Sequence, residues 1–141
     1  MYFELSITIR RPPLEVFTFL RDKDKHPRGV LLLEKVTPGE PGVGTLYREV
    51  VQMMPFVREE ILSVITRFDP DEYLDENFEG AGFKGHLAYQ FLQEDDRTRL
   101  IQRETMFARG LLKVFEPLIK RMFCRHLQER LEAIKAILES A

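Results

Sequence analysis

The sequence has few of the residues on which metal or nucleophile chemistry depends. Cys124 is its only cysteine, which excludes an internal disulfide and a four-cysteine zinc site. The histidines, His26, His86 and His126, are far apart, and none belongs to a His-Glu-x-x-His pair on a helix. The serines are equally sparse, and none sits at a nucleophile elbow. We therefore expect no metal, no cofactor and no Ser-His-Asp triad.

Long apolar runs and a strong excess of one charge are also missing. No stretch approaches about 18 uninterrupted apolar residues, so we expect no transmembrane segment. The N-terminus lacks a basic segment followed by an apolar run, which predicts a cytoplasmic protein without a signal peptide. The net charge of −2 argues against a nucleic-acid-binding protein with a broad basic surface.

The residues that are present indicate a globular protein. Of 141 residues, 44% are hydrophobic and 31% are charged, which argues against disorder. The length predicts a single domain over residues 1–141. Tryptophan is missing, but there are 11 phenylalanines. Their rings can fill a core or line an apolar pocket, and composition does not decide between the two.

The most regular pattern lies near the C-terminus, over residues 110–138. Apolar residues recur there at the i, i+3, i+4, i+7 spacing of an amphipathic helix, with charged residues between them. From Pro117 to Leu138 such a helix is on the order of 33 Å long. Pro117 either begins this helix or kinks it, because proline has no amide donor. Basic residues over 113–130 alternate with Glu116 and Glu129, which favours a solvated face over a membrane patch.

Strands and turns dominate the rest of the chain. Alternating apolar and polar side chains over residues 2–10 predict a half-buried strand, and prolines then introduce a short helix over about 13–21, with one more turn after it. Apolar runs between turn residues predict six further strands, over 30–36, 44–54, 57–68, 72–79, 86–93 and 98–107. The short connections imply that neighbouring strands are antiparallel.

This order of elements resembles the helix-grip fold of the SRPBCC superfamily, also called START-like or Bet v 1-like. Its polyketide cyclase/dehydratase-type members are the most similar. Besides the opening alternation, the local marks of the resemblance are Arg11–Phe17, Gly42–Arg48, Val64–Pro70, Thr98–Leu100 and Leu127–Leu138. Together they span essentially the whole chain.

The resemblance implies an α+β fold with a cavity. A seven-stranded antiparallel sheet would curve around the C-terminal helix, with one or two short helices after the first strand. In this superfamily the space between helix and sheet typically holds a lipid, a sterol, a polyketide or another largely apolar molecule. No catalytic motif is common to all members, so the resemblance assigns no catalytic residue.

The alternation of strand residues selects side chains that should face the cavity. The predicted ligand-binding residues are Tyr47, Phe78, Tyr89, Phe91, Gln102, Glu104 and Met106 from the strands, and Phe115, Ile119, Met122 and His126 from the helix. Gln102, Glu104 and Glu76 are polar residues on otherwise apolar faces. A carboxylate in a dry core is costly, so either the cavity is wet or these strands face the other way.

Three functions remain open at this point. The first is binding of a hydrophobic small molecule in the cavity. The second is a polyketide cyclase/dehydratase-type enzyme, with Glu104 or His126 as the catalytic candidate that moves a proton. The third is a macromolecular interaction module, like the coenzyme Q-binding and ribosome-associated branches of the superfamily.

Two loops have a predicted role in these functions. The apolar hairpin tip Met53–Phe56 would be the contact of an interaction module, and it could equally be an entrance rim, a homodimer contact, a membrane-touching tip or part of the core. The glycine-rich loop 80–85 is predicted to be a turn at the cavity rim, and its Phe83 could form a mobile lid over the cavity mouth.

Overall fold

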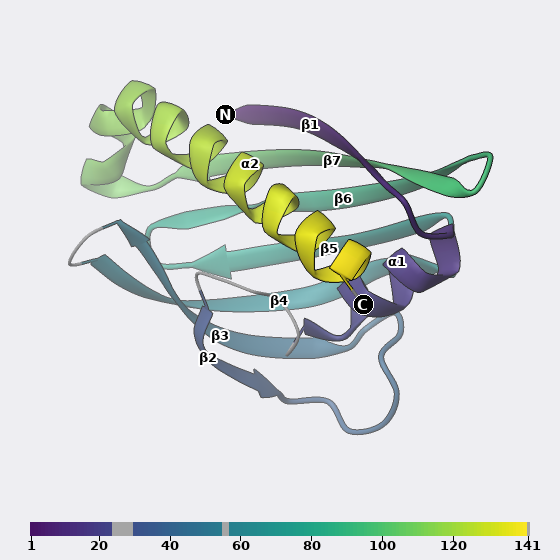
Figure 1. Cartoon of the computed structure of the whole chain (residues 1–141). Coiled ribbons are helices and arrows are strands. Elements are labelled where there is room, and N and C mark those ends of the chain that lie inside the picture. Colours follow the sequence, from purple (N-terminus) through teal and green to yellow (C-terminus); the bar gives the residue numbers. More distant parts are fainter. Residues whose placement is uncertain (24–29, 55–56, 141) are drawn as a thin grey trace.

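A computed structural model describes residues 1–23, 30–54 and 57–140, in which an antiparallel sheet grips one long helix (Figure 1). The strands are β1 (Tyr2–Ile9), β2 (Val30–Lys35), β3 (Leu46–Met54), β4 (Val57–Asp69), β5 (Tyr73–Gly80), β6 (Phe83–Glu94) and β7 (Arg97–Ala108). They form one sheet in the order β1-β7-β6-β5-β4-β3-β2. The helices are α1 (Pro13–Arg21), the 3-10 helix η2 (Gly110–Phe115) and α2 (Glu116–Ser140). The predicted α+β helix-grip fold, with its seven strands, is confirmed.

The short helix α1 follows β1 directly because two prolines end the strand. Pro13 lies in the first turn of α1, where its missing N–H has no intrahelical partner to lose. Val16, Phe17 and Leu20 are buried. The ring of Phe17 packs edge to face against Phe91 of β6, with 5.4 Å between the ring centroids. These contacts fix α1 against the sheet, and the helix predicted over 13–21 is confirmed.

The long helix α2 lies across one face of the sheet (Figure 1) and buries a single apolar stripe. This stripe consists of Ile119, Phe123, Leu127, Leu131, Ile134 and Leu138. The far end of α2 is attached to β1 and the residue after it: Lys135 Nζ donates to the Thr8 carbonyl oxygen at 2.6 Å, and the Arg10 N–H donates to Glu139 Oε2 at 2.9 Å. The helix is therefore held by packing along its length and by polar contacts at its C-terminal end.

The amphipathic run at the C-terminus is divided at residue 116. Gly110–Phe115 forms η2, and the α-helix begins at Glu116. Pro117 thus lies in the first turn of α2, where proline removes no intrahelical hydrogen bond. Of the two alternatives for Pro117, the structure shows that it begins the main helix.

Phe83 belongs to the core, and the prediction that it forms a mobile lid is wrong. Only Ala81 and Gly82 separate β5 from β6, which begins at Phe83. The side chain of Phe83 is fully buried, and its ring packs edge to face against Phe123 of α2, with 5.6 Å between the centroids. The nearby glycines suggested a loop. One of them, Gly85, instead lies within β6, where an added Cβ would collide with its neighbours.

Candidate functional site

A cavity of about 150 Å³, partly open to solvent, lies between the sheet and α2. Its apolar lining consists of Leu20, Val51, Ile61, Ile65, Leu74, Phe78, Leu87, Met106, Phe123 and Leu127. Its polar lining consists of Arg21, Lys23, Glu49, Gln52, Glu76, Tyr89, Glu104, His126 and Arg130. An engineered cavity of roughly 150 Å³ in another protein holds benzene, so this space suits a ring-sized ligand or one end of a longer molecule.

The strand register brings two carboxylates to the floor of this cavity. Glu76 of β5 and Glu104 of β7 are both paired with Leu87 of β6, one on each side. Directly paired residues point to the same face of a sheet, and all three line the cavity. An apolar side chain therefore separates the two acidic groups.

Lys23, two residues past the end of α1, is the centre of a buried ion cluster. Its Nζ atom lies 2.6 Å from Glu76 Oε2 and 3.3 Å from Glu49 Oε1, and it donates to Ser63 Oγ at 3.0 Å. The ammonium group also lies 4.9 Å from the centroid of the Tyr47 ring. Burial alone would lower the pKa of Lys23, but Glu76 and Glu49 raise it above its ordinary value. Lys23 is therefore charged, and its charge is balanced within the cluster.

Glu104 is in a different situation from the carboxylates around Lys23. Its Oε2 atom is buried and has no hydrogen-bond partner among the described residues. Burial raises the pKa of Glu104 to about 7, an effect that Arg130 opposes and Glu76 reinforces. Near neutral pH the carboxyl group is thus present in both protonation states, and it can donate a hydrogen bond in one and accept it in the other.

Two neighbours of Glu104 also bury polar atoms that the fold leaves unmatched. Tyr89 is paired with Gln102 across β6 and β7. Within the described part of the chain, neither the Tyr89 hydroxyl nor either amide atom of Gln102 has a hydrogen-bond partner. Gln102 lies close enough to Glu104 to lower its pKa slightly, without meeting the geometry of a hydrogen bond. Leaving such a group unsatisfied typically costs about 1–3 kcal/mol, so native proteins usually match it with a water molecule or a ligand.

Arg130 and His126 of α2 contribute to the polar lining of the cavity from the helix side. Burial alone would lower the pKa of Arg130, but Tyr89, Glu76 and Glu104 raise it. Arg130 therefore remains cationic. The cavity thus has apolar walls and one end at which acidic, basic and hydroxyl groups face one another.

Solved structures with the same architecture identify the fold. TTHA0849 from Thermus thermophilus superposes with a TM-score of 0.84 at 17% sequence identity, over 99% of this chain and 98% of that chain. A START superfamily protein from Mycobacterium smegmatis gives a TM-score of 0.82 at 11% identity, over 99% and 97% of the two chains. The Zhui aromatase/cyclase from Streptomyces sp. R1128 gives 0.72 at 16% identity, over 95% and 93%. The chain shares the helix-grip fold of these structures. No protein-family model and no curated protein matches the sequence.

Within this helix-grip fold, the predicted ligand-binding residues fall into three groups. Those that line the cavity are Phe78, Tyr89, Glu104, Met106 and His126. Those that are buried but lie outside the lining are Tyr47, Phe91, Gln102 and Ile119. Those that are exposed are Phe115, at 55%, and Met122, at 37%. Both catalytic candidates, Glu104 and His126, are in the first group, and their use by a ligand or a reaction remains a prediction.

Local packing explains why some of these residues lie outside the cavity. Phe91 packs against Phe17 of α1 and belongs to the core beneath that helix. On α2, the buried stripe passes through Ile119 and Phe123, which turns Met122 toward solvent. Phe115 lies in η2, before α2 begins.

The predicted ligand-binding residues did not include Lys23, Glu49 or Arg130. Lys23 lies in a polar segment, and nothing in its spacing indicates that it turns inward. Glu49 shares a strand face with Tyr47, so the alternation along β3 was a usable signal. Arg130 lies two helical turns after Phe123, so the period of α2 was also a usable signal.

Three further sequence predictions can be compared with the described residues. The hairpin tip Met53–Phe56 lies outside the residues whose side chains the structure describes. In the described ranges, no three His, Cys, Asp or Glu side chains come together as a metal site would require. No helix in those ranges is long and apolar enough to cross a membrane.

Proposed function

We propose that the protein binds a small, mostly apolar molecule in the cavity between the sheet and α2. The observation that carries this proposal is a pair of buried polar atoms, the Tyr89 hydroxyl and Glu104 Oε2, which belong to residues that line the cavity and have no hydrogen-bond partner among the described residues. A region that served only as a core would be close-packed, with its polar groups paired. The shared fold with an aromatase/cyclase supports a small-molecule ligand.

The chemistry of the cavity favours a neutral ligand with a ring and one hydroxyl or carbonyl group. The apolar walls would supply most of the affinity, at roughly 25 cal/mol per Å² of buried apolar surface before the costs of association. Tyr89 and Glu104 would orient the ligand by hydrogen bonds to its oxygen. Lys23 is a poor receptor for an anionic ligand because Glu76 and Glu49 already balance its charge.

The test is a calorimetric titration with 2-naphthol on the wild type and two tryptophan variants. Ile61→Trp would fill the cavity, since Ile61 lines it. Leu62→Trp is the matched control, because Leu62 is next in β4 and is 46% exposed. We expect saturable binding to the wild type and to Leu62→Trp, and none to Ile61→Trp. Equal binding to both variants would show that the ligand lies elsewhere. Native mass spectrometry of the purified wild type should also show a co-purified apolar compound.

A second candidate function is proton transfer on such a ligand, and the pKa of Glu104 favours it. A carboxyl group whose pKa is about 7 can both take and return a proton near neutral pH. In dehydration of a β-hydroxyketone, its carboxylate would remove the proton from the carbon next to the carbonyl. The resulting carboxylic acid would then protonate the departing hydroxyl, which leaves as water.

This second candidate has its own test. Turnover of a β-hydroxyketone, followed by the absorbance of the enone product, should fall by roughly 100-fold or more in Glu104→Gln. His126→Ala tests the other catalytic candidate in the same assay. Binding of 2-naphthol to Glu104→Gln reports whether the cavity is intact. Wild-type turnover by Glu104→Gln would exclude Glu104 as the proton carrier.

A further inference from the structure

Five exposed apolar side chains follow one another along η2 and the first turns of α2. Their spacings are three, one, three and four residues, and with their exposed fractions they are Leu111 (85%), Val114 (76%), Phe115 (55%), Leu118 (57%) and Met122 (37%). We call this set the η2–α2 stripe. It is distinct from the buried stripe, which begins at Ile119. Single exposed apolar residues are ordinary, but a contiguous group of this kind marks a contact surface.

The segment that contains the η2–α2 stripe also carries basic side chains. Lys113, Lys120 and Arg121 are exposed, and none of them forms an ion pair or hydrogen bond with another side chain in residues 1–23, 30–54 or 57–140. Glu116 is the only acidic residue between Gly110 and Phe123. Residues 110–123 thus contain three basic residues and one acidic residue, whereas the chain as a whole has a net charge of −2.

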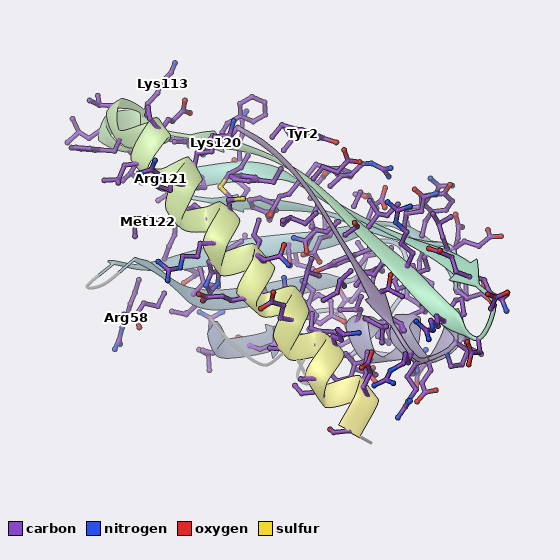
Figure 2. The ribbon with its side chains drawn as sticks, turned by 45° about the horizontal axis from the view of Figure 1, so that its top comes forward. Tyr2, Arg58, Lys113, Lys120, Arg121 and Met122 are labelled. Carbon is purple, nitrogen blue, oxygen red and sulfur yellow. The ribbon has the colours of Figure 1, made fainter. Side chains whose placement is uncertain are left out.

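Figure 2 shows where these residues lie in the molecule. Lys113, Lys120 and Arg121 project from the end of the helical region at which Met122 also emerges. Apolar and basic side chains thus gather at one end of the molecule.

We infer that the η2–α2 stripe docks the protein on a membrane surface that contains anionic lipids. Helices that lie in the plane of a bilayer interface combine apolar side chains, which enter the headgroup boundary, with Lys and Arg, which attract anionic headgroups. The η2–α2 stripe supplies the apolar side chains, and Lys113, Lys120 and Arg121 of the same segment supply the basic ones. A second copy of this chain is a poorer partner, because a two-fold contact would bring the same three basic residues together.

The structure changes the interpretation that the sequence pattern favours for this segment. The alternation of basic residues with Glu116 and Glu129 indicated a solvated face. Glu129, however, lies beyond the stripe and is paired with Arg125, 3.5 Å from Arg125 Nε to Glu129 Oε1. The pattern also could not show that Leu111, Leu118 and Met122 face solvent rather than the core.

The test is flotation of the protein with vesicles of phosphatidylcholine alone, or of phosphatidylcholine with phosphatidylserine. The wild type should float only with the anionic vesicles, and added salt should release it. Lys113→Glu/Lys120→Glu/Arg121→Glu should lower the partition coefficient by roughly 100-fold or more. Leu111→Ser/Phe115→Ser/Leu118→Ser should abolish flotation. The matched control, Lys35→Glu/Arg97→Glu/Arg99→Glu, makes the same charge change at exposed residues outside the stripe and should float like the wild type.

Circular dichroism would establish that each variant is folded, as expected for changes at exposed positions. Failure of the wild type to float with anionic vesicles would overturn the inference, and so would an equal loss in the control. If light scattering shows a dimer that only the serine variant abolishes, and no species floats, the stripe is a self-association surface instead. None of these outcomes depends on a ligand in the cavity.

Discussion

Tyr89 buries a hydroxyl group that has no hydrogen-bond partner in the described part of the chain. Tyr89→Phe is therefore expected to leave the free energy of unfolding unchanged or to raise it by about 1 kcal/mol, because it removes an unpaired buried polar group. The same change should weaken 2-naphthol binding by roughly 5-fold, the effect of one lost hydrogen bond. Urea denaturation and calorimetric titration measure the two effects. A hydroxyl with a purely structural role would give the reverse, a less stable protein that binds as before.

Glu104 should make the protein less stable as the pH rises toward neutrality. Its pKa is about 7 in the folded protein, against an ordinary value of 4.5. Between these values the folded state holds a proton that the unfolded state has released, so the free energy of unfolding falls as pH increases. Relative to Glu104→Gln, the wild type should lose on the order of 3 kcal/mol across this window and little above it. Parallel stability curves for the two proteins would contradict this assignment.

The attachment of α2 to the end of β1 should have the opposite pH dependence. Hydrogen bonds from the Lys135 side chain and the Arg10 backbone N–H lower the pKa of Glu139 to about 2. The stabilisation is therefore present above the ordinary pKa of 4.5 and is lost as the pH falls toward 2. Glu139→Gln should be less stable than the wild type at neutral pH, and this difference in stability should disappear as the pH approaches about 2.

Denaturant titrations at several pH values measure this difference. Glu132→Gln is the matched control, since Glu132 is an exposed glutamate on the same helix, and it should behave like the wild type throughout. If Glu139→Gln differs from the wild type by the same amount at acidic and neutral pH, the carboxylate does not anchor the helix.

The strands and helices could be predicted from the sequence. Which residues of the C-terminal helical region face solvent could not. Alternation of side chains located the strands, and the i, i+4 pattern located α2. The prediction failed at Phe115 because η2 has about three residues per turn, whereas an α-helix has about 3.6. Extending the α-helical period of α2 backwards therefore predicts the wrong side-chain direction for a residue in η2.

The molecule as a whole shows why the fold was more predictable than the site. Hydrophobic periodicity reports which residues face a core, and it correctly predicted a sheet wrapped around α2. It contains no information on which polar residues meet across the cavity. Lys23 and Glu76 are far apart in the chain. Their nitrogen and oxygen atoms lie 2.6 Å apart because the end of α1 and the residues after it line the same cavity as β5.

The claim on which the functional account depends is that the space between α2 and the sheet accepts a small apolar molecule. Titration of methyl-labelled protein with 2-naphthol, followed by NMR, tests it most directly. We predict saturable shifts of the methyl groups of Leu74, Leu87, Met106 and Leu127, which line the cavity. The methyl groups of Ile134 and Leu138, which are buried outside the lining, should not move. Saturable shifts confined to residues outside the lining, or no saturable shift at all, would contradict the account.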